Sequence, residues 1–210
     1  MGVIRSGILS RVSGKVAGVV GGSWKDKAYL REYVIPANPN TVPQQIQRLK
    51  MAQVVAFAVN LVGQVFNVYT DKFERGMSGF NRFVKDNIAL MGAPITFASV
   101  IVTRGKLWGV VAQTAELSAG VVDIAWDAAI IGNNGAATDH VYAALYSEVT
   151  DLWFYPAAEV HRSTSGITIN CAGETSAPDL KLYIWAAQYS PTSTSLLQMI
   201  SNSSFKQVTV

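Results

Sequence analysis

The chain has 210 residues and half of them are apolar, which is enough hydrophobic material for one moderate domain or two small ones and excludes a disordered chain. The formal net charge is +3, but residues 1–50 hold eight Lys and Arg against two acids, whereas residues 106–210 hold four against nine. This polarity predicts a basic arm that touches nucleic acid or a basic end that packs on an acidic neighbour, and the alternative is two solvated surfaces without a partner.

Residues 1–37 mix Gly, Val and basic residues without helical periodicity, and we expect a basic, Gly-rich arm or hairpin there. Residues 23–34 place aromatic side chains among charged ones, as an edge hairpin does. These side chains could stack on bases and meet phosphates, but a hairpin with a packed aromatic face and solvated lysines is favoured. The candidate interface residues of this segment are Arg5, Arg11, Lys15, Trp24, Lys25, Tyr29 and Arg31.

A rigid joint precedes the first helix. Pro39 restricts Asn38 to extended geometry, Thr41 is a good N-cap, and Gln44 completes a capping box three residues later. We therefore expect one helix over residues 42–69, with the joint as part of an interface. The candidate interface residues here are Asn38, Pro39, Thr41, Gln44 and Arg48.

Four uncharged polar residues recur on this helix at offsets of seven, four and three, which predicts one shared face. An amide stripe flanked by Ala and Val is typical of a surface packed on another polypeptide, and the alternative is an exposed face that lacks charge. The stripe consists of Gln53, Asn60, Gln64 and Asn67. Its polar residues also interrupt the most apolar stretch of the chain, so we expect no membrane span. A second helix is expected over residues 78–90, capped by Ser78.

From residue 105 the pattern changes to short β-type runs separated by turn residues. About seven strands over roughly 105 residues are typical of an antiparallel sandwich of the immunoglobulin or fibronectin III type. In residues 141–146 and 180–185 the alternation predicts one buried face and one wetter face. The fold class expected is α+β, divided into an arm or hairpin (1–37), a helical region (38–104) and a β-sandwich (105–210). The expected strands are 107–112, 121–126, 140–146, 153–155, 166–171, 180–188 and 196–201, the last with a closing run at 205–210.

The sequence does not match the common motifs for catalysis, cofactor binding or metal binding. Val16 follows Gly14-Lys15 where a phosphate loop needs Ser or Thr. Neither His140 nor His161 has a metal-ligand residue two, three or four positions later, and the sequence contains no Gly-x-Ser-x-Gly elbow. We therefore expect no catalytic residue, no cofactor and no metal. A hydrolase built on His161 is the weakest alternative, and it needs a serine or carboxylate within hydrogen-bonding reach of that histidine.

The N-terminal quarter resembles a known pattern. SGKVAGVVGGSWKDKAYLR at Ser13–Arg31 and NPNTVPQQIQR at Asn38–Arg48 are similar to the S-G-K-V-G, W-K-G and N-P-x-T-x-x-Q-x-x-x-R segments of an uncharacterised family of similar size. Ala17 and Asp26 replace two glycines of the pattern, and either Gln44 or Gln45 can correspond to its glutamine. That family, a domain of unknown function, occurs in Bacteroidetes-type bacteria, and similar segments occur in phage proteins near virion genes. The resemblance implies a structural role more than a reaction.

These observations together predict a non-enzymatic structural or assembly protein. The specific hypothesis is a phage virion component, a capsid or tail-associated decoration protein, which self-associates through its N-terminal half and assembles in the host cytoplasm. Its expected partners are its own copies and other virion proteins, with nucleic-acid contact by the basic arm left open. The alternative function is a cell-surface or carbohydrate-binding β-sandwich module, because Trp108, Trp126, Trp153 and Trp185 lie in the β part, although most are expected in the core. The alternative location is the bacterial cytoplasm or cell surface.

Overall fold

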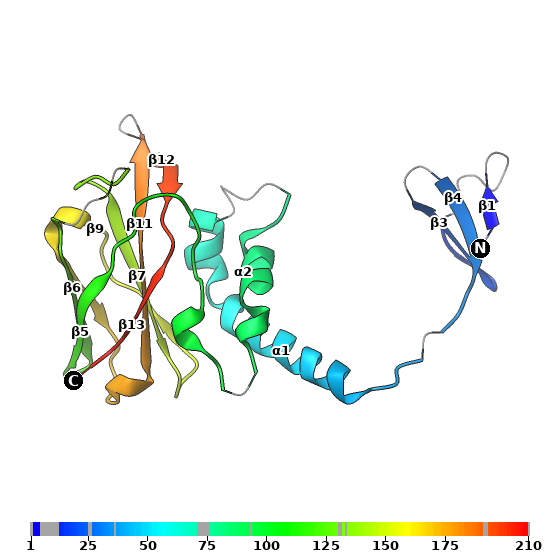
Figure 1. The fold of residues 1–210 in the computed structure, drawn as a ribbon, viewed down its shortest axis with the longest axis horizontal. Coiled ribbons are helices and arrows are strands. Elements are labelled where there is room, and N and C mark those ends of the chain that lie inside the picture. The colour runs from blue at the N-terminus through cyan, green and yellow to red at the C-terminus, as the bar shows by residue number, and fades with distance from the viewer. Residues whose placement is uncertain are drawn as a thin grey trace. The chain divides into compact units, whose positions relative to one another are not determined.

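The computed structural model describes residues 2–4, 13–24, 27–35, 37–70, 76–92, 94–129, 132, 134–190 and 193–209. The chain forms two compact units, residues 1–41 and residues 42–210. Helices and antiparallel sheets occur together (Figure 1), so the expected mixture of helix and antiparallel sheet is confirmed.

The first unit is a small antiparallel sheet with the strand order β1-β4-β3-β2. The hairpin expected at residues 23–34 is present, although its first strand begins earlier, at Val19. The Tyr29 ring packs over Gly22, where a Cβ would lie 2.9 Å from the end of the ring. Ala17, where the pattern has glycine, turns between β2 and β3 with a φ of 52°. The strands are β1 (Gly2–Ile4), β2 (Gly14–Val16), β3 (Val19–Trp24) and β4 (Lys27–Glu32).

The single helix expected over residues 42–69 is wrong. The structure has α1 (Val42–Val59), then a π-helix, η1 (Val62–Thr70), and the two are bent by 83°. The bend occurs where the Asn60 carbonyl accepts a hydrogen bond from the Tyr155 hydroxyl, 3.1 Å away, and where the Leu61 carbonyl accepts from both Val65 and Phe66. The bend lets Leu61, Val65, Phe66 and Tyr69 all enter the core. The free energy gained by burying these side chains outweighs the advantage of a straight, regular helix.

The second helix, α2 (Gly79–Asn87), begins where the sequence predicts. The Ser78 hydroxyl accepts from the Asn81 amide at 3.3 Å, and a 3₁₀ turn, η2 (Ile88–Leu90), follows the helix. A further 3₁₀ turn, η3 (Phe97–Ser99), leads toward the strands. In the described part of the chain no single helix is long and apolar enough to cross a membrane, and only the bent pair of α1 and η1 reaches that length and apolarity together.

Two antiparallel sheets make up the rest of the second unit. One has the order β10-β6-β5; the other has β12-β11-β7-β8, with β13 also paired to β11 and β9 to β7. The strand expected at residues 107–112 is wrong, because the ladder there begins only at Ala112. The strands are β5 (Ala112–Ser118), β6 (Val121–Trp126), β7 (His140–Ser147), β8 (Trp153–Phe154), β9 (Val160–His161), β10 (Gly166–Asn170), β11 (Leu180–Ser190), β12 (Ser193–Ile200) and β13 (Ser204–Gln207).

The central strands β7 and β11 are buried on both faces. Their aliphatic positions, such as Leu145 and Ile184, pack against the β10-β6-β5 sheet, whereas Tyr142, Tyr183 and Trp185 face the helices. The expectation of a wetter face on these strands is therefore wrong. Side chains do alternate between the two faces with a period of two, but the helical layer covers the face that carries the aromatic side chains.

Phe57 of α1 is the centre of the layer between helices and sheet. Its ring lies 4.7 Å from that of Tyr146, 4.8 Å from Trp153 and 5.9 Å from Phe83, measured between centroids. Aromatic contacts of this kind add to the free energy gained by burying the rings. The residues expected as a helical region and those expected as a β-sandwich thus contribute to one shared core.

Candidate assembly surfaces

The strand register gathers cations and aromatic rings on one face of the N-terminal sheet. Lys15 lies opposite Val20, which lies opposite Arg31, and Trp24 lies opposite Lys27. Cross-strand partners share a face of a sheet. We call this the basic face; its described members are Lys15, Val20, Gly22, Trp24, Lys27, Tyr29 and Arg31.

The basic face has a strong positive charge and an uncovered ring. Three of its described residues are cations and none is a carboxylate, because Glu32 lies opposite Val19 on the other face. Lys15 places its Nζ 3.7 Å from the centroid of the Tyr33 ring, a cation–π contact that leaves the charge in place. Trp24 is 71% exposed. Four of the seven candidates predicted in this segment therefore lie on one face, while Arg5, Arg11 and Lys25 lie outside the described residues.

The joint and the first turns of α1 are exposed. Asn38, Pro39, Thr41, Gln44 and Arg48 all lie at the surface of their own units. Figure 1 shows the first turns of α1 extending past the rest of the second unit. Along them an apolar stripe at i, i+4 and i+7 is exposed and belongs to neither core of the described residues; it consists of Val42, Ile46 and Leu49.

The expected amide stripe does not form a single face. Gln53 is half-buried on α1, Asn60 lies at the bend, and Gln64 and Asn67 are exposed on the π-helix. The prediction assumed one straight helix, and the 83° bend separates its members. Gln53 keeps one unusual property, because its buried Oε1 has no hydrogen-bond partner in the described part of the chain.

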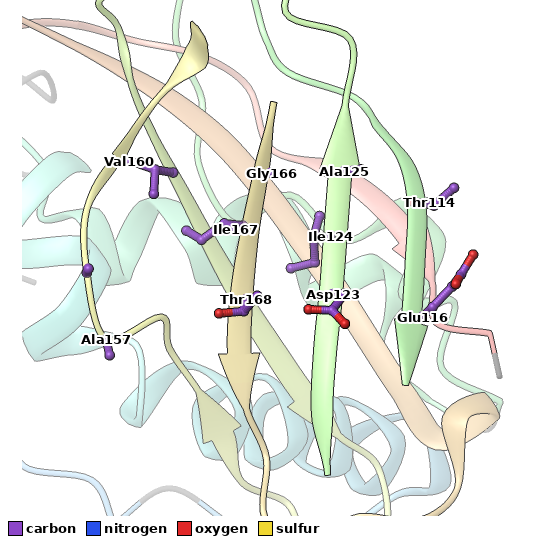
Figure 2. Close-up of a pocket in the computed structure, with 11 residues that line it drawn as sticks. Thr114, Glu116, Asp123, Ile124, Ala125, Ala157, Val160, Gly166, Ile167 and Thr168 are labelled. Carbon is purple, nitrogen blue, oxygen red and sulfur yellow. The ribbon is translucent and has the colours of Figure 1, made fainter. Parts of the chain in front are cut away.

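A groove that the sequence did not predict lies on the outer face of the β10-β6-β5 sheet. It has a volume of about 450 Å³, and Ala157 and Val160, on the segment beside β10, line its side away from β5 (Figure 2). Small side chains line most of it, and two carboxylates, Glu116 and Asp123, stand on its floor. We call it the acidic groove; the residues that matter below are Glu116, Asp123, Ala125, Ala157, Ala158 and Thr168.

The two carboxylates of the acidic groove are cross-strand partners. Glu116 on β5 lies opposite Asp123 on β6, which in turn lies opposite Thr168 on β10. Like charges directly opposite each other destabilise a sheet. No ion pair joins either carboxylate to a residue that the structure describes. The pair is thus a site of unrelieved negative charge, and only the strand register could have revealed it.

The described residues do not assemble the constellation that a His161 hydrolase needs. The His161 Nδ1 lies 2.9 Å from the Thr138 carbonyl oxygen, and the nearby carboxylate of Glu159 pairs instead with His140 at 3.1 Å. Within the described ranges no cluster of three or more His, Cys, Asp or Glu side chains could hold a metal ion.

Comparison with protein-family models places most of the chain in one family. Residues 11–195 match the model of a family described as a family of unknown function, DUF6266. No curated protein matches the chain.

Proposed function

This chain belongs to DUF6266, a family of unknown function, and we propose that it is a non-enzymatic assembly protein that self-associates through its N-terminal half. The observation that carries the proposal is the basic face, which presents three cations and an uncovered indole on a sheet with little core of its own. Exposed apolar residues concentrate in the same part of the chain, as surfaces built for association do. They are Val16, Val19, Trp24, Tyr33, Val34, Ile35, Val42, Ile46, Leu49 and Met51.

The acidic groove of a second copy is the complement that the basic face fits. Trp24 and Lys27 are cross-strand partners at the end of the β3–β4 hairpin, so an indole and an ammonium group project together. A groove floored by small side chains can receive the indole, and Glu116 and Asp123 can neutralise the cations. Because the basic face and the acidic groove are different surfaces, the contact between copies is heterologous. It therefore repeats from copy to copy and gives a closed ring or an open array.

Within this proposal, the second unit carries an immunoglobulin-like or fibronectin III-like sandwich that projects from the assembly. In support, β5, β6 and β10 form one sheet in the order A-B-E, and β8, β7, β11 and β12 form the facing sheet in the order C′-C-F-G. An aliphatic core lies between the two sheets.

The specific setting that we propose is a phage virion, as a capsid or tail-associated decoration assembled in the host cytoplasm with other virion proteins. Repeating contacts between identical copies suit such particles, and the resemblance of the N-terminal segments to proteins encoded near virion genes supports it. Contact of the basic face with nucleic acid is the competing use of the same cations. The bacterial cytoplasm or cell surface is the alternative location.

Charge reversal, followed by mixing of the reversed variants, tests the pairing of the basic face with the acidic groove. One variant, Lys27→Glu with Arg31→Glu, makes the basic face acidic, and the other, Glu116→Lys with Asp123→Lys, makes the groove basic. Each variant alone should be monomeric in light scattering, because like charges then meet. An equimolar mixture should associate again, since each variant supplies what the other lacks.

The matched control for this experiment is Glu32→Lys, on the opposite face of the same sheet, which should assemble as the unmodified chain does. Far-UV circular dichroism checks that every variant is folded. Association of both reversed variants on their own would refute the pairing, and so would a mixture that stays monomeric.

A further inference from the structure

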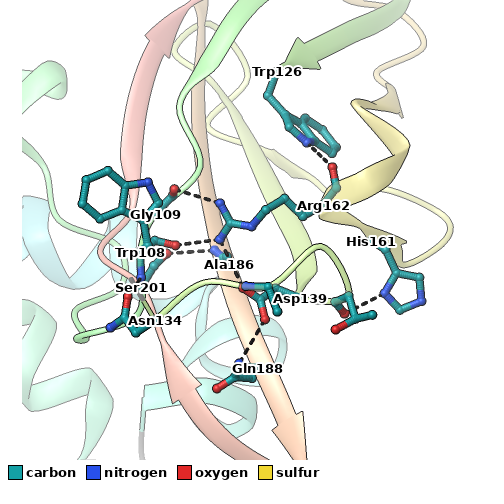
Figure 3. A network of polar contacts seen from close by, with 12 residues as sticks. Trp108, Gly109, Trp126, Asn134, Asp139, His161, Arg162, Ala186, Gln188 and Ser201 are labelled. Carbon is teal, nitrogen blue, oxygen red and sulfur yellow. Dashed lines mark hydrogen bonds and ion pairs between the residues drawn. The ribbon is translucent and has the colours of Figure 1, made fainter. Parts of the chain in front are cut away.

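Trp108 is an exposed side chain that the fold holds in place. Of the tryptophans in the second unit, Trp126 and Trp185 are buried and Trp153 is half-buried, but Trp108 is 48% exposed. An exposed indole on a loose loop would need no explanation. Trp108 lies instead in the extended segment before β5, where several side chains from distant parts of the chain fix its backbone and ring (Figure 3).

Three contacts fix this residue. The Trp108 amide donates to the Oδ1 of Asn134 at 3.0 Å, and its carbonyl accepts from the Nη2 of Arg162 at 2.7 Å. Arg162 also donates from Nη1 to the Gly109 carbonyl at 3.2 Å. The indole itself packs over Gly132, where a Cβ would lie 2.2 Å from the ring, so only glycine fits beneath it.

Arg162 is held in turn by a buried ion pair. Its Nη2 lies 3.4 Å from Oδ2 of Asp139, both side chains are 1% exposed, and Gln188 donates to the other carboxylate oxygen at 3.3 Å. Desolvating such a pair is costly, and apolar side chains of similar size often stabilise a fold as well or better. Burial lowers the pKa of Arg162, and the Asp139 carboxylate opposes that shift. The direct structural result of this arrangement is a fixed backbone at residues 108 and 109.

A groove of about 550 Å³ lies beside the fixed indole, and polar side chains line it. The Gln113 side chain and the Asn202 Nδ2 make no hydrogen bond with the residues that the structure describes, and Asp127 uses only Oδ1, which accepts from Ala129. The Nε of Arg162, at the wall of the groove, is buried without a partner in the same described residues.

We infer that this groove binds a neutral saccharide, with Trp108 as the platform for one face of a sugar ring. A rigid, half-exposed indole offers flat apolar area to the C–H face of a pyranose. The amides of Gln113 and Asn202 and the carboxylate of Asp127 supply both donors and acceptors for hydroxyl groups. A few polar groups around an apolar surface are the usual composition of a small-molecule site.

The same lining argues against an anionic ligand such as a nucleotide. The cation at the groove is Arg162, and it is already paired with Asp139 and with two carbonyl groups. Asp127 adds a negative charge on the rim. A phosphate would therefore meet a carboxylate without a free cation to offset it.

The test uses the full chain on a printed array of neutral glycans, followed by calorimetric titration with hexasaccharides of glucose, xylose, mannose and N-acetylglucosamine. We expect saturable binding of at least one of these probes. Trp108→Ala should weaken it by roughly tenfold or more, and Gln113→Ala by a smaller factor. Leu152→Ala, which removes another exposed apolar side chain of the second unit that does not line the groove, is the control and should leave the dissociation constant unchanged.

Three results would overturn the inference: no glycan bound on the array or in titration, binding that survives Trp108→Ala, or a preference for phosphate-bearing probes. Gln113→Ala guards against a folding artefact, because that side chain makes no hydrogen bond within the described ranges. The outcome is independent of assembly, since Trp108→Ala should keep the light-scattering behaviour of the unmodified chain whether or not the proposed function holds.

Discussion

Deletion of residues 1–37 is expected to abolish self-association while leaving residues 42–210 folded. Both hydrophobic cores consist entirely of residues from the second unit, so the deletion removes no buried side chain from them. It removes the whole basic face, including Lys15, Lys27 and Arg31. The truncated chain should stay monomeric in light scattering and keep the melting temperature of the full chain.

The control for the deletion is Lys15→Gln with Lys27→Gln and Arg31→Gln in the full chain, which keeps the sheet and removes its charge. It should also be monomeric if charge drives docking. A truncated chain that assembles as well as the full chain would contradict the account, and so would loss of the folded state on truncation.

Replacement of Phe57 by Ala is expected to have the largest effect on stability. The ring is buried against Phe83, Tyr146 and Trp153, so its removal leaves a cavity between the helical layer and the sheet. Substitutions of this kind cost about 4 kcal/mol of unfolding free energy. For a unit of this size that corresponds to a fall of roughly 10 °C in melting temperature.

The same variant tests whether helices and sheets unfold together. Because they share the Phe57 core, differential scanning calorimetry should show one transition for residues 42–210 that moves as a whole. Met51→Ala, an exposed position on the same helix, is the control and should change stability by less than about 0.5 kcal/mol. Two separate transitions, only one of them shifted by Phe57→Ala, would show that the layers are independent.

Local sequence rules predicted the elements whose signals are local. Ser78 caps α2 as expected, and the turn residues separate strands such as β6 and β11 close to the predicted bounds. The bend at Asn60 could not be predicted, because it depends on the Tyr155 hydroxyl, 95 residues away in sequence. The segment at residues 107–111 failed for the same reason, since the carbonyls of Trp108 and Gly109 bond to the distant Arg162 side chain.

Half of the proposed contact could be predicted from sequence. Charge counting found Lys15 and Arg31, and the mixture of aromatic and charged residues indicated Trp24 and Tyr29, before their common face was known. The acidic groove could not be found in this way. Glu116 and Asp123 are ordinary acids in the sequence, and only the pairing of β5 with β6 places them side by side.

Multi-angle light scattering on the full chain over a range of concentrations and salt tests the central claim most directly. The account predicts a molar mass that rises above the 22.6 kDa of one chain as concentration increases at low ionic strength. It also predicts a return toward that value at high salt, where a charge-driven contact is screened. A mass of 22.6 kDa at every concentration and every ionic strength would contradict self-association through the basic face.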